Sequence, residues 1–170
     1  MSRREKRGVL RLKTEAPAFG CIVSPVCFSR DGTMLAAKAR DSILVADPAT
    51  GKDLLRLDGV RPRAFSLAPN GNLMAWSQQG EMLVRTTGAE GTEFRVSTAL
   101  ATVLAFSPDG TLLASLDAKS VVRFWDTGQR KELASVRLDG AKDRLAFSPD
   151  GARMAIAGER FVAIVPVPAR

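Results

Sequence analysis

Short hydrophobic runs alternate with polar turn sequences along nearly the whole chain, and no stretch keeps the spacing of an amphipathic helix. In the middle of the chain, residues 102–107 form one such run, and residues 111–116, 121–125 and 132–138 form the next three. Polar turns of two to six residues separate them. Strands of this length joined by short turns are typical of an antiparallel meander. The pattern therefore predicts an all-β protein.

The same pattern occurs four times, and each copy is marked by a five-residue turn sequence that ends in Gly. Phe-Ser-Pro-Asp-Gly stands in full at 106–110 and 147–151, and related sequences occupy 28–32 and 67–71. The four glycines are 39, 39 and 41 residues apart. In such a turn Pro presets φ, Gly accepts a positive φ and the Asp carboxylate accepts backbone hydrogen bonds. The chain therefore consists largely of four repeats.

These repeats resemble the WD40 repeat family of β-propellers. The resemblance rests on the Phe-Ser-Pro-Asp-Gly blocks, the Leu-Leu-Ala-Ser run at 112–115 and the pair Trp125-Asp126. It implies four-stranded antiparallel blades over residues 8–167. Repeats of the family often carry a Gly-His pair and an Asp before the third strand, which form a hydrogen-bonded tetrad with Ser or Thr and Trp. This chain has no His, and Lys119 stands at the Asp position, so we expect no tetrad and blades held by apolar packing alone.

The fourth copy ends after its third strand, near Val165, which leaves one strand missing from sixteen. Residues 9–13 resemble the outer strands at 54–57 and 136–138, so we predict that they close the last blade and remove two open edges. Residues 1–7 are a basic arm that we expect to be disordered. Three architectures stay open: a closed four-bladed ring, a half-ring that forms an eight-bladed homodimer, and a fragment or open array. The blade angles of the family favour the half-ring.

Composition excludes several classes of function. The chain has 170 residues, 45% of them hydrophobic and none of them His, so Ser-His-Asp, Cys-His and imidazole–zinc sites cannot be built. No Gly-rich phosphate-binding motif occurs. If Cys21 and Cys27 lie on one extended segment, about 20 Å separates them, which is too far for a disulfide. We therefore expect no enzyme, no catalytic residue, no cofactor and no metal.

The apolar runs are far shorter than the stretch that crosses a bilayer, and the basic start of the chain is not followed by the apolar segment of a signal peptide. We therefore expect a cytoplasmic protein without membrane contact. The formal net charge of +7 is unevenly placed, because residues 1–13 carry six Lys and Arg against Glu5, a net +5. The other 157 residues share only +2. Attraction to nucleic acid would therefore come mostly from the N-terminal arm.

If the family topology holds, one face of the propeller is made by the turns between second and third strands and by the connections from blade to blade. The resemblance implies that partners dock on this face. The candidate contact residues are long polar side chains in these loops: Arg40, Arg61, Gln78, Lys119, Lys142 and Arg160. The predicted function is a non-catalytic scaffold that presents this face to a protein partner. The alternatives are polyanion binding through the Arg-rich N-terminal arm and basic loops, and an accessory or sensor module of an enzyme encoded elsewhere.

Overall fold

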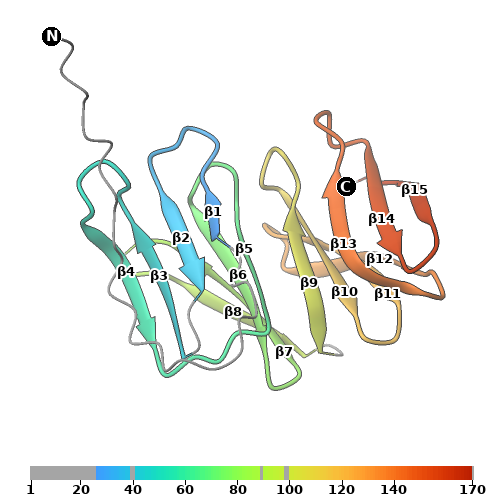
Figure 1. Cartoon of the computed structure of the whole chain (residues 1–170), viewed down its shortest axis with the longest axis horizontal. Coiled ribbons are helices and arrows are strands. Elements are labelled where there is room, and N and C mark those ends of the chain that lie inside the picture. Colours follow the sequence, from blue (N-terminus) through green and yellow to red (C-terminus); the bar gives the residue numbers. More distant parts are fainter. Residues whose placement is uncertain (1–25, 39–40, 89, 98–99, 170) are drawn as a thin grey trace, which may run out of the picture.

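A computed structural model describes residues 26–38, 41–88, 90–97 and 100–169, without the side chains of residues 97, 142 and 143. In this part of the chain the regular structure consists of strands in four antiparallel sheets (Figure 1). The described residues contain no helix long and apolar enough to cross a membrane. The predicted all-β fold with propeller-type blades is confirmed. Residues 1–13, which include the predicted arm and closing strand, lie outside the described residues.

Each sheet is a meander of consecutive strands, and we call the sheets blades 1 to 4. Blade 1 contains β1 (Val26–Phe28), β2 (Leu35–Lys38), β3 (Ser42–Ala46) and β4 (Asp53–Asp58). Blade 2 contains β5 (Ala64–Leu67), β6 (Leu73–Gln78), β7 (Glu81–Thr86) and β8 (Glu93–Ser97). Blade 3 contains β9 (Ala101–Phe106), β10 (Leu112–Asp117), β11 (Val121–Asp126) and β12 (Lys131–Arg137). Blade 4 contains β13 (Ala141–Phe147), β14 (Arg153–Gly158) and β15 (Val162–Pro166).

The repeated turn, which is Asp-Gly in blades 1, 3 and 4 and Asn-Gly in blade 2, joins the first strand of a blade to the second, and we call all four the Asp-Gly turns. In blades 1, 3 and 4 the same hydrogen bonds of a Ser and an Asp recur. In blade 3 the Ser107 hydroxyl donates to Asp109 at 2.6 Å and accepts from the Leu112 N–H at 2.9 Å. Asp109 also accepts from the Thr111 N–H at 3.0 Å, and Gly110 has a φ of +74°. The hydrogen bond from Ser107 is the main cause that lowers the pKa of Asp109. The predicted structural role of this carboxylate is therefore confirmed.

The hydrophobic core lies between successive blades, so the blades pack face to face in chain order. Blades 1 and 2 enclose one cluster, which includes Ile43 and Trp76. Blades 2 and 3 enclose a second cluster around Met82 and Trp125, and blades 3 and 4 a third around Phe124. Burial of such aliphatic and aromatic side chains is the main term that stabilises each contact. The strands are therefore fixed by their neighbours, and the turns at the blade ends are held on a rigid support.

Candidate partner-binding face

One end of the blades carries the turns between second and third strands together with the connections from one blade to the next. We call this end the loop face, and it comprises Asp41 and residues 59–63, 78–80, 118–120, 138–140 and 159–161. Strands alternate in direction within a meander, so these segments all emerge at the same end. The Asp-Gly turns lie at the opposite end, in the upper part of Figure 1. Positive φ values at Gly59, Gly80 and Gly140 permit the tight turns of the loop face.

Arg61 joins three segments of the loop face. Its Nε lies 3.1 Å from the carboxylate of Asp41 in blade 1, and its backbone N–H donates to the side chain of Gln78 in blade 2 at 3.2 Å. The Arg61 side chain is nonetheless exposed. The structure therefore brings two of the predicted contact residues, Arg61 and Gln78, next to each other. An exposed ion pair of this kind adds little stability, but it orients the guanidinium at the surface.

A second link ties blade 1 to the connection that leads into blade 2. The ammonium group of Lys38, at the end of β2, donates to the backbone carbonyl of Arg63 at 3.2 Å. Burial lowers the pKa of Lys38, and the nearby charge of Arg63 lowers it further. Arg63 itself donates its backbone N–H to the Ser77 carbonyl at 2.7 Å. The connection between the two blades is therefore held from both sides.

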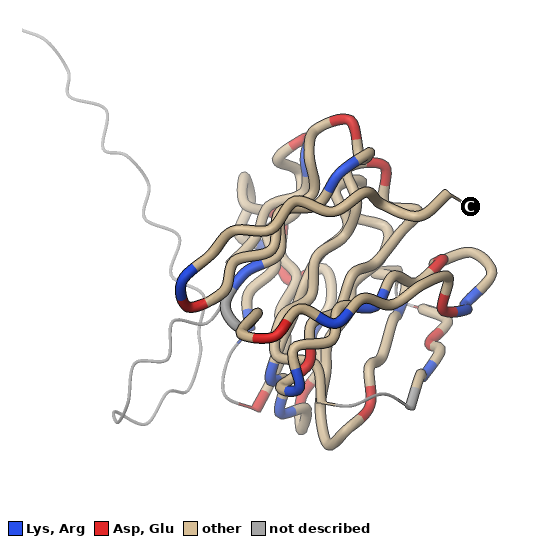
Figure 2. Tube along the Cα trace, turned by 90° about the vertical axis from the view of Figure 1, so that its right-hand side faces the viewer, with Lys and Arg blue, Asp and Glu red and all other residues tan. Residues whose placement is uncertain are grey.

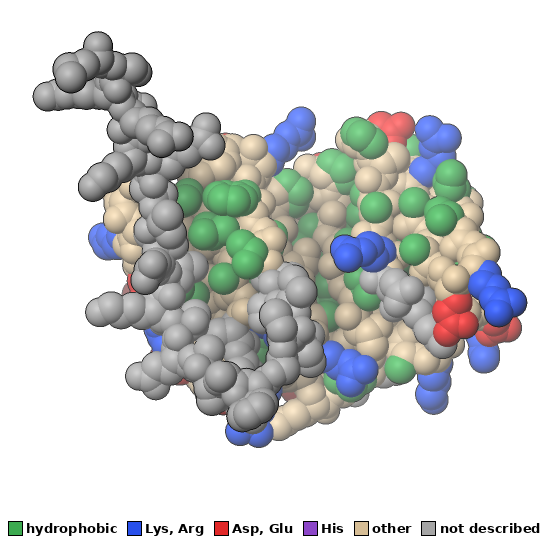
Figure 3. All heavy atoms as spheres, viewed as in Figure 1, with side chains coloured by type: hydrophobic (Ala, Val, Ile, Leu, Met, Phe, Trp, Pro, Cys, Tyr) green, Lys and Arg blue, Asp and Glu red, His purple; other side chains and the backbone are tan. Residues whose placement is uncertain are grey.

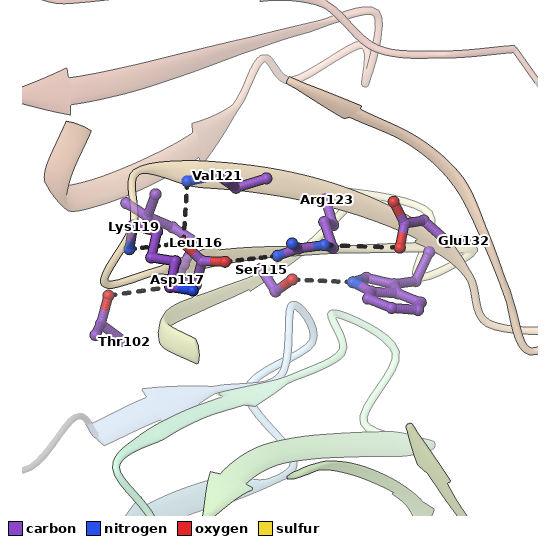
Figure 4. A network of polar contacts seen from close by, with 9 residues as sticks. Thr102, Ser115, Leu116, Asp117, Lys119, Val121, Arg123 and Glu132 are labelled. Atoms are coloured by element: carbon purple, nitrogen blue, oxygen red, sulfur yellow. Dashed lines mark hydrogen bonds and ion pairs between the residues drawn. The ribbon is translucent and has the colours of Figure 1, made fainter. Parts of the chain in front are cut away.

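A buried carboxylate organises the turn that carries Lys119 (Figure 4). Asp117 accepts hydrogen bonds from the N–H groups of Lys119 at 2.8 Å and Val121 at 3.1 Å, and from the Arg123 guanidinium at 2.7 Å. Arg123 also lies 3.7 Å from the carboxylate of Glu132 on the neighbouring strand. The network fixes the backbone of the turn, including Ser120 with a φ of +63°. The exposed Lys119 side chain is thereby presented from a rigid base.

The charge of Asp117 is maintained although its side chain is only 2% exposed. Burial alone would raise the pKa of this carboxyl, since a charged group loses hydration inside a protein. The hydrogen bond from Arg123, those from the N–H groups of Val121 and Lys119, and the charge of Arg123 outweigh that effect. The pKa of Asp117 therefore lies below its ordinary value of 3.8.

The expectation that the blades are held by apolar packing alone is wrong. The indole N–H of Trp125 donates to the Ser115 hydroxyl at 2.9 Å, and both residues are buried in blade 3. The contact joins a Ser and a Trp, as in the tetrad that the resemblance implies, and Asp117 supplies a carboxylate in the same turn in which Lys119 stands at the expected Asp position. Polar contacts within this blade therefore add to the packing. In blade 2, the indole nitrogen of Trp76 is buried without a hydrogen-bond partner.

Two buried serines connect the loop face to the following blade. The Ser77 hydroxyl donates to the Ala101 carbonyl at the start of β9 at 2.7 Å. In the same way, the Ser120 hydroxyl donates to the Ala141 carbonyl at the start of β13 at 3.0 Å. Because both acceptors begin the first strand of the next blade, these bonds fix the position of each connection. The loop face therefore behaves as one surface across the blades.

The remaining predicted contact residues take different positions. Arg160 is exposed in the turn between β14 and β15, and Lys119 is exposed in the turn between β10 and β11. Lys142 belongs to β13 rather than to the connection before it, and its side chain is not described. Arg40 lies outside the described residues. The structure thus places Arg61, Gln78, Lys119 and Arg160 on the loop face.

Sequence reasoning missed Asp117 and Arg123, the pair that supports the loop face. The available signal was Arg123, a charged residue in the middle of the apolar strand β11, with Asp117 at the end of the strand before it. A charge at such a position needs a partner, because an unpaired buried charge is costly. Among the described residues, no three His, Cys, Asp or Glu side chains gather as a metal site. Burial raises the pKa of the free Cys27 thiol to about 11, so the thiol stays protonated at neutral pH.

Comparison with known proteins supports the fold of propeller-type blades. Residues 93–126 match the family model WD40, described as WD domain, G-beta repeat. Among solved structures, the chain is similar to Kuenenia stuttgartiensis hydrazine synthase, with a TM-score of 0.67 and 19% sequence identity. The match covers 83% of this chain and 45% of that chain, so this chain spans less than half of its length, and the likeness shows the fold alone. A search of curated proteins found no match.

Proposed function

We propose that this chain, which matches a WD40 repeat at residues 93–126 and is built of propeller-type blades, is a non-catalytic scaffold whose loop face binds a protein partner. WD40 domains in general mediate protein–protein interaction. In folds of this kind, function resides in loops that a rigid framework positions. The proposal for this chain rests on its own loop face, where side chains from different blades are joined and exposed.

One observation carries the proposal: hydrogen bonds from inside the fold fix the backbone of the loop face, while its polar side chains are exposed to solvent. Arg61 joins segments of blades 1 and 2, and Asp117 holds the turn of Lys119 from inside the fold. Lys119, Arg61 and Arg160 remain exposed above this support. A surface whose backbone is already fixed loses less conformational entropy when a partner binds. This favours a specific complex over a loose, nonspecific contact.

The charge distribution favours a protein over a polyanion. In the described chain, basic and acidic residues are interspersed rather than collected on one side (Figure 2). On the loop face itself, Arg61 pairs with Asp41, and Asp139 lies at the neighbouring connection to blade 4. A nucleic-acid interface would instead show one continuous basic stripe. We therefore propose a partner surface of mixed charge, with acidic groups opposite Lys119 and Arg160.

Charge reversal on the loop face tests the proposal. The double variant Lys119→Glu, Arg160→Glu changes two exposed side chains and should reduce recovery of a co-purified protein partner about tenfold, because like charges across an interface repel. The matched control is Lys52→Glu, Lys131→Glu, which reverses two exposed charges at the opposite end of the blades. Quantitative affinity purification of all three proteins measures the effect.

Two outcomes contradict the proposal. Equal recovery by the loop-face variant and the wild type would show that the partner binds elsewhere. A complex that is lost steeply between about 0.15 M and 0.5 M salt, and that also disappears when residues 2–7 are deleted, would indicate a polyanion bound by the arm. A complex that tolerates the added salt and the deletion, but not the two substitutions, supports the loop face.

A further inference from the structure

Each contact between blades repeats the same positions. Three apolar residues on the second and third strands of one blade face the next blade, and all nine of them are at most 2% exposed: Ala36, Ile43 and Val45 in blade 1, Ala75, Met82 and Val84 in blade 2, and Ala114, Val122 and Phe124 in blade 3. We call this side of a blade its forward face. In blades 1 to 3 the forward face is therefore an apolar surface that the next blade buries.

The forward face of blade 4 keeps the apolar character, but none of the described residues covers it. The residues at the equivalent positions are Ala155, Val162 and Ile164. Val162 is 70% exposed and Ile164 67% exposed. A shallow hollow on this face is lined in part by Ala146, Ala155 and Ile164. Hydrophobic side chains also gather at the surface over β14 and β15 in the space-filling view (Figure 3).

Blade 1 exposes the surface that, in the other blades, packs against the forward face of the preceding blade. Its first strand carries Val26 and Phe28, each 60% exposed, on the side that faces away from blade 2. The residues equivalent to them in blade 2, Phe65 and Leu67, are only 5% and 6% exposed because blade 1 covers them. We call this side of a blade its backward face. Leu35 on β2 lies on the backward face of blade 1 but is buried, so the exposed part of that face is the first strand, β1. Within the described part of the chain, the forward face of blade 4 and strand β1 on the backward face of blade 1 are therefore both uncovered.

The Asp-Gly turns repeat this relation independently. A Cβ atom added to Gly71 would meet Met34 of blade 1, one added to Gly110 would meet Asn70 of blade 2, and one added to Gly151 would meet Pro108 of blade 3. Each turn thus packs against the blade before it. Gly32 of blade 1 has no atom within 4 Å of the same point. The turn of blade 1 therefore has an open space where its three counterparts have a preceding blade.

We propose that the forward face of blade 4 packs against the backward face of blade 1 of a second copy of this chain. Within one copy both surfaces are exposed, so the chain does not cover them with each other. Two copies have two such pairs of surfaces, and a twofold axis satisfies both pairs at once and gives a closed ring of eight blades. In each copy, closure of the ring covers four apolar side chains that are now 60–70% exposed: Val26, Phe28, Val162 and Ile164. Their removal from water favours the dimer.

Charge complementarity supports this pairing. Arg153 on β14 occupies the position that Met34 holds in blade 1, and Met34 contacts the turn of Gly71 in the next blade. In the proposed contact, Arg153 therefore meets the equivalent turn around Gly32 of the second copy. That turn carries Asp31, whose carboxylate lies at the exposed end of the blade. The only basic residue at this repeat position thus lies opposite an acidic group.

The solution mass of the full chain tests the proposal. Light scattering coupled to size-exclusion chromatography should give twice the chain mass of 18.2 kDa. Ile164→Asp places a charge in the forward face of blade 4 and should return the mass to that of one chain. Ser135→Asp adds the same charge at an exposed strand position in blade 3 and should leave the dimer intact. Far-UV circular dichroism of each variant checks that the blades are folded.

Mixing complementary variants tests the head-to-tail geometry. Phe28→Lys places a positive charge on the backward face of blade 1 and should also give a single-chain mass. In a mixture of Phe28→Lys with Ile164→Asp, one contact is wild type and the other pairs Lys with Asp. The mixture should therefore recover the dimer that neither variant forms alone.

Three results would overturn the proposal. A wild-type chain at the mass of one copy across the concentration range would indicate that another segment, such as residues 9–13 of the same chain, covers blade 4. A dimeric Ile164→Asp variant would place the contact on another surface. A monomeric mixture would exclude the pairing of blade 4 with blade 1.

Discussion

Replacing Asp117 by Ala should lower the free energy of unfolding by about 3 kcal/mol, because it leaves the partly buried Arg123 with only the more distant carboxylate of Glu132, at 3.7 Å. Arg123 would lose its 2.7 Å contact, and the N–H groups of Lys119 and Val121 would lose their acceptor. For a chain of this length, the loss corresponds to a fall in Tm of roughly 10 °C. Denaturant unfolding and thermal melts at neutral pH measure it.

Asp139→Ala is the matched control. Asp139 also accepts a hydrogen bond from an Arg, at 2.9 Å from the Nε of Arg137, but both side chains are largely exposed. An exposed pair of this kind contributes between 0 and about 1 kcal/mol. Asp117→Asn keeps acceptors for the two N–H groups and should fall between Asp117→Ala and the wild type. Equal stability of the Asp117→Ala and Asp139→Ala variants would contradict the role of the network.

The effect of Asp117→Ala should also depend on pH. The folded state holds the pKa of Asp117 below 3.8, so the charged carboxylate stabilises the fold above that pH. As pH falls below about 4, the unfolded state takes up the proton first, and the stabilisation is fully lost once the folded state is also protonated, below its lowered pKa. The stability difference between wild type and Asp117→Ala should therefore be constant near neutral pH and shrink in acid. A difference that grows in acid would contradict the assigned charge.

The second large effect is expected at the contact between blades 3 and 4. Phe124 is 2% exposed, and its ring packs edge-on against Phe147 of blade 4, with 6.5 Å between centroids. Phe124→Ala should cost about 3–5 kcal/mol, since it removes buried apolar contacts and leaves a cavity. The measurement is the free energy of unfolding by denaturant.

Phe124→Leu provides the graded comparison at the same site. Leu retains most of the apolar volume, and such swaps cost less than about 1.5 kcal/mol. The two variants should therefore differ by at least about 1.5 kcal/mol. If Phe124→Ala and Phe124→Leu were equally stable, blade 4 would not depend on this contact with blade 3.

Much of the fold could be predicted from the sequence because its determinants are local. The four predicted strands of the third repeat agree with β9 to β12 within about one residue at most ends, since turn residues with fixed φ preferences delimit them. Trp125, part of the Trp-Asp pair that carries the resemblance, is buried between blades 2 and 3. Alternation and turn chemistry repeat in register, so four copies reinforce one another.

The contacts across strands could not be predicted in the same way. The pairing of Asp117 with Arg123 depends on a register in which Ser115 lies opposite Arg123, and the Ser115–Trp125 bond depends on side-chain direction across the same hairpin. The family pattern led to a wrong prediction here, because Lys119 at the expected Asp position suggested that no polar contacts stabilise the blade. The carboxylate is present two residues earlier in the chain, at Asp117.

The fold supports the proposed function by holding the loop face in one conformation. Buried interfaces between blades fix the strands, Asp117 and the serines at 77 and 120 fix the turns, and the exposed side chains above them are then presented in one geometry. An interaction scaffold needs this property, because specificity depends on a constant arrangement of contacts. The proposed function therefore depends on where on the chain the partner binds.

Hydrogen–deuterium exchange of the chain with and without its purified partner locates that surface most directly. We predict that the partner slows exchange in the loop face, at residues 59–63, 78–80, 118–120 and 159–161. The Asp-Gly turns at the opposite end, near residues 30–33, 69–72, 108–111 and 149–152, should exchange at unchanged rates. Protection confined to those turns, with the loop face unaffected, would contradict the proposed function.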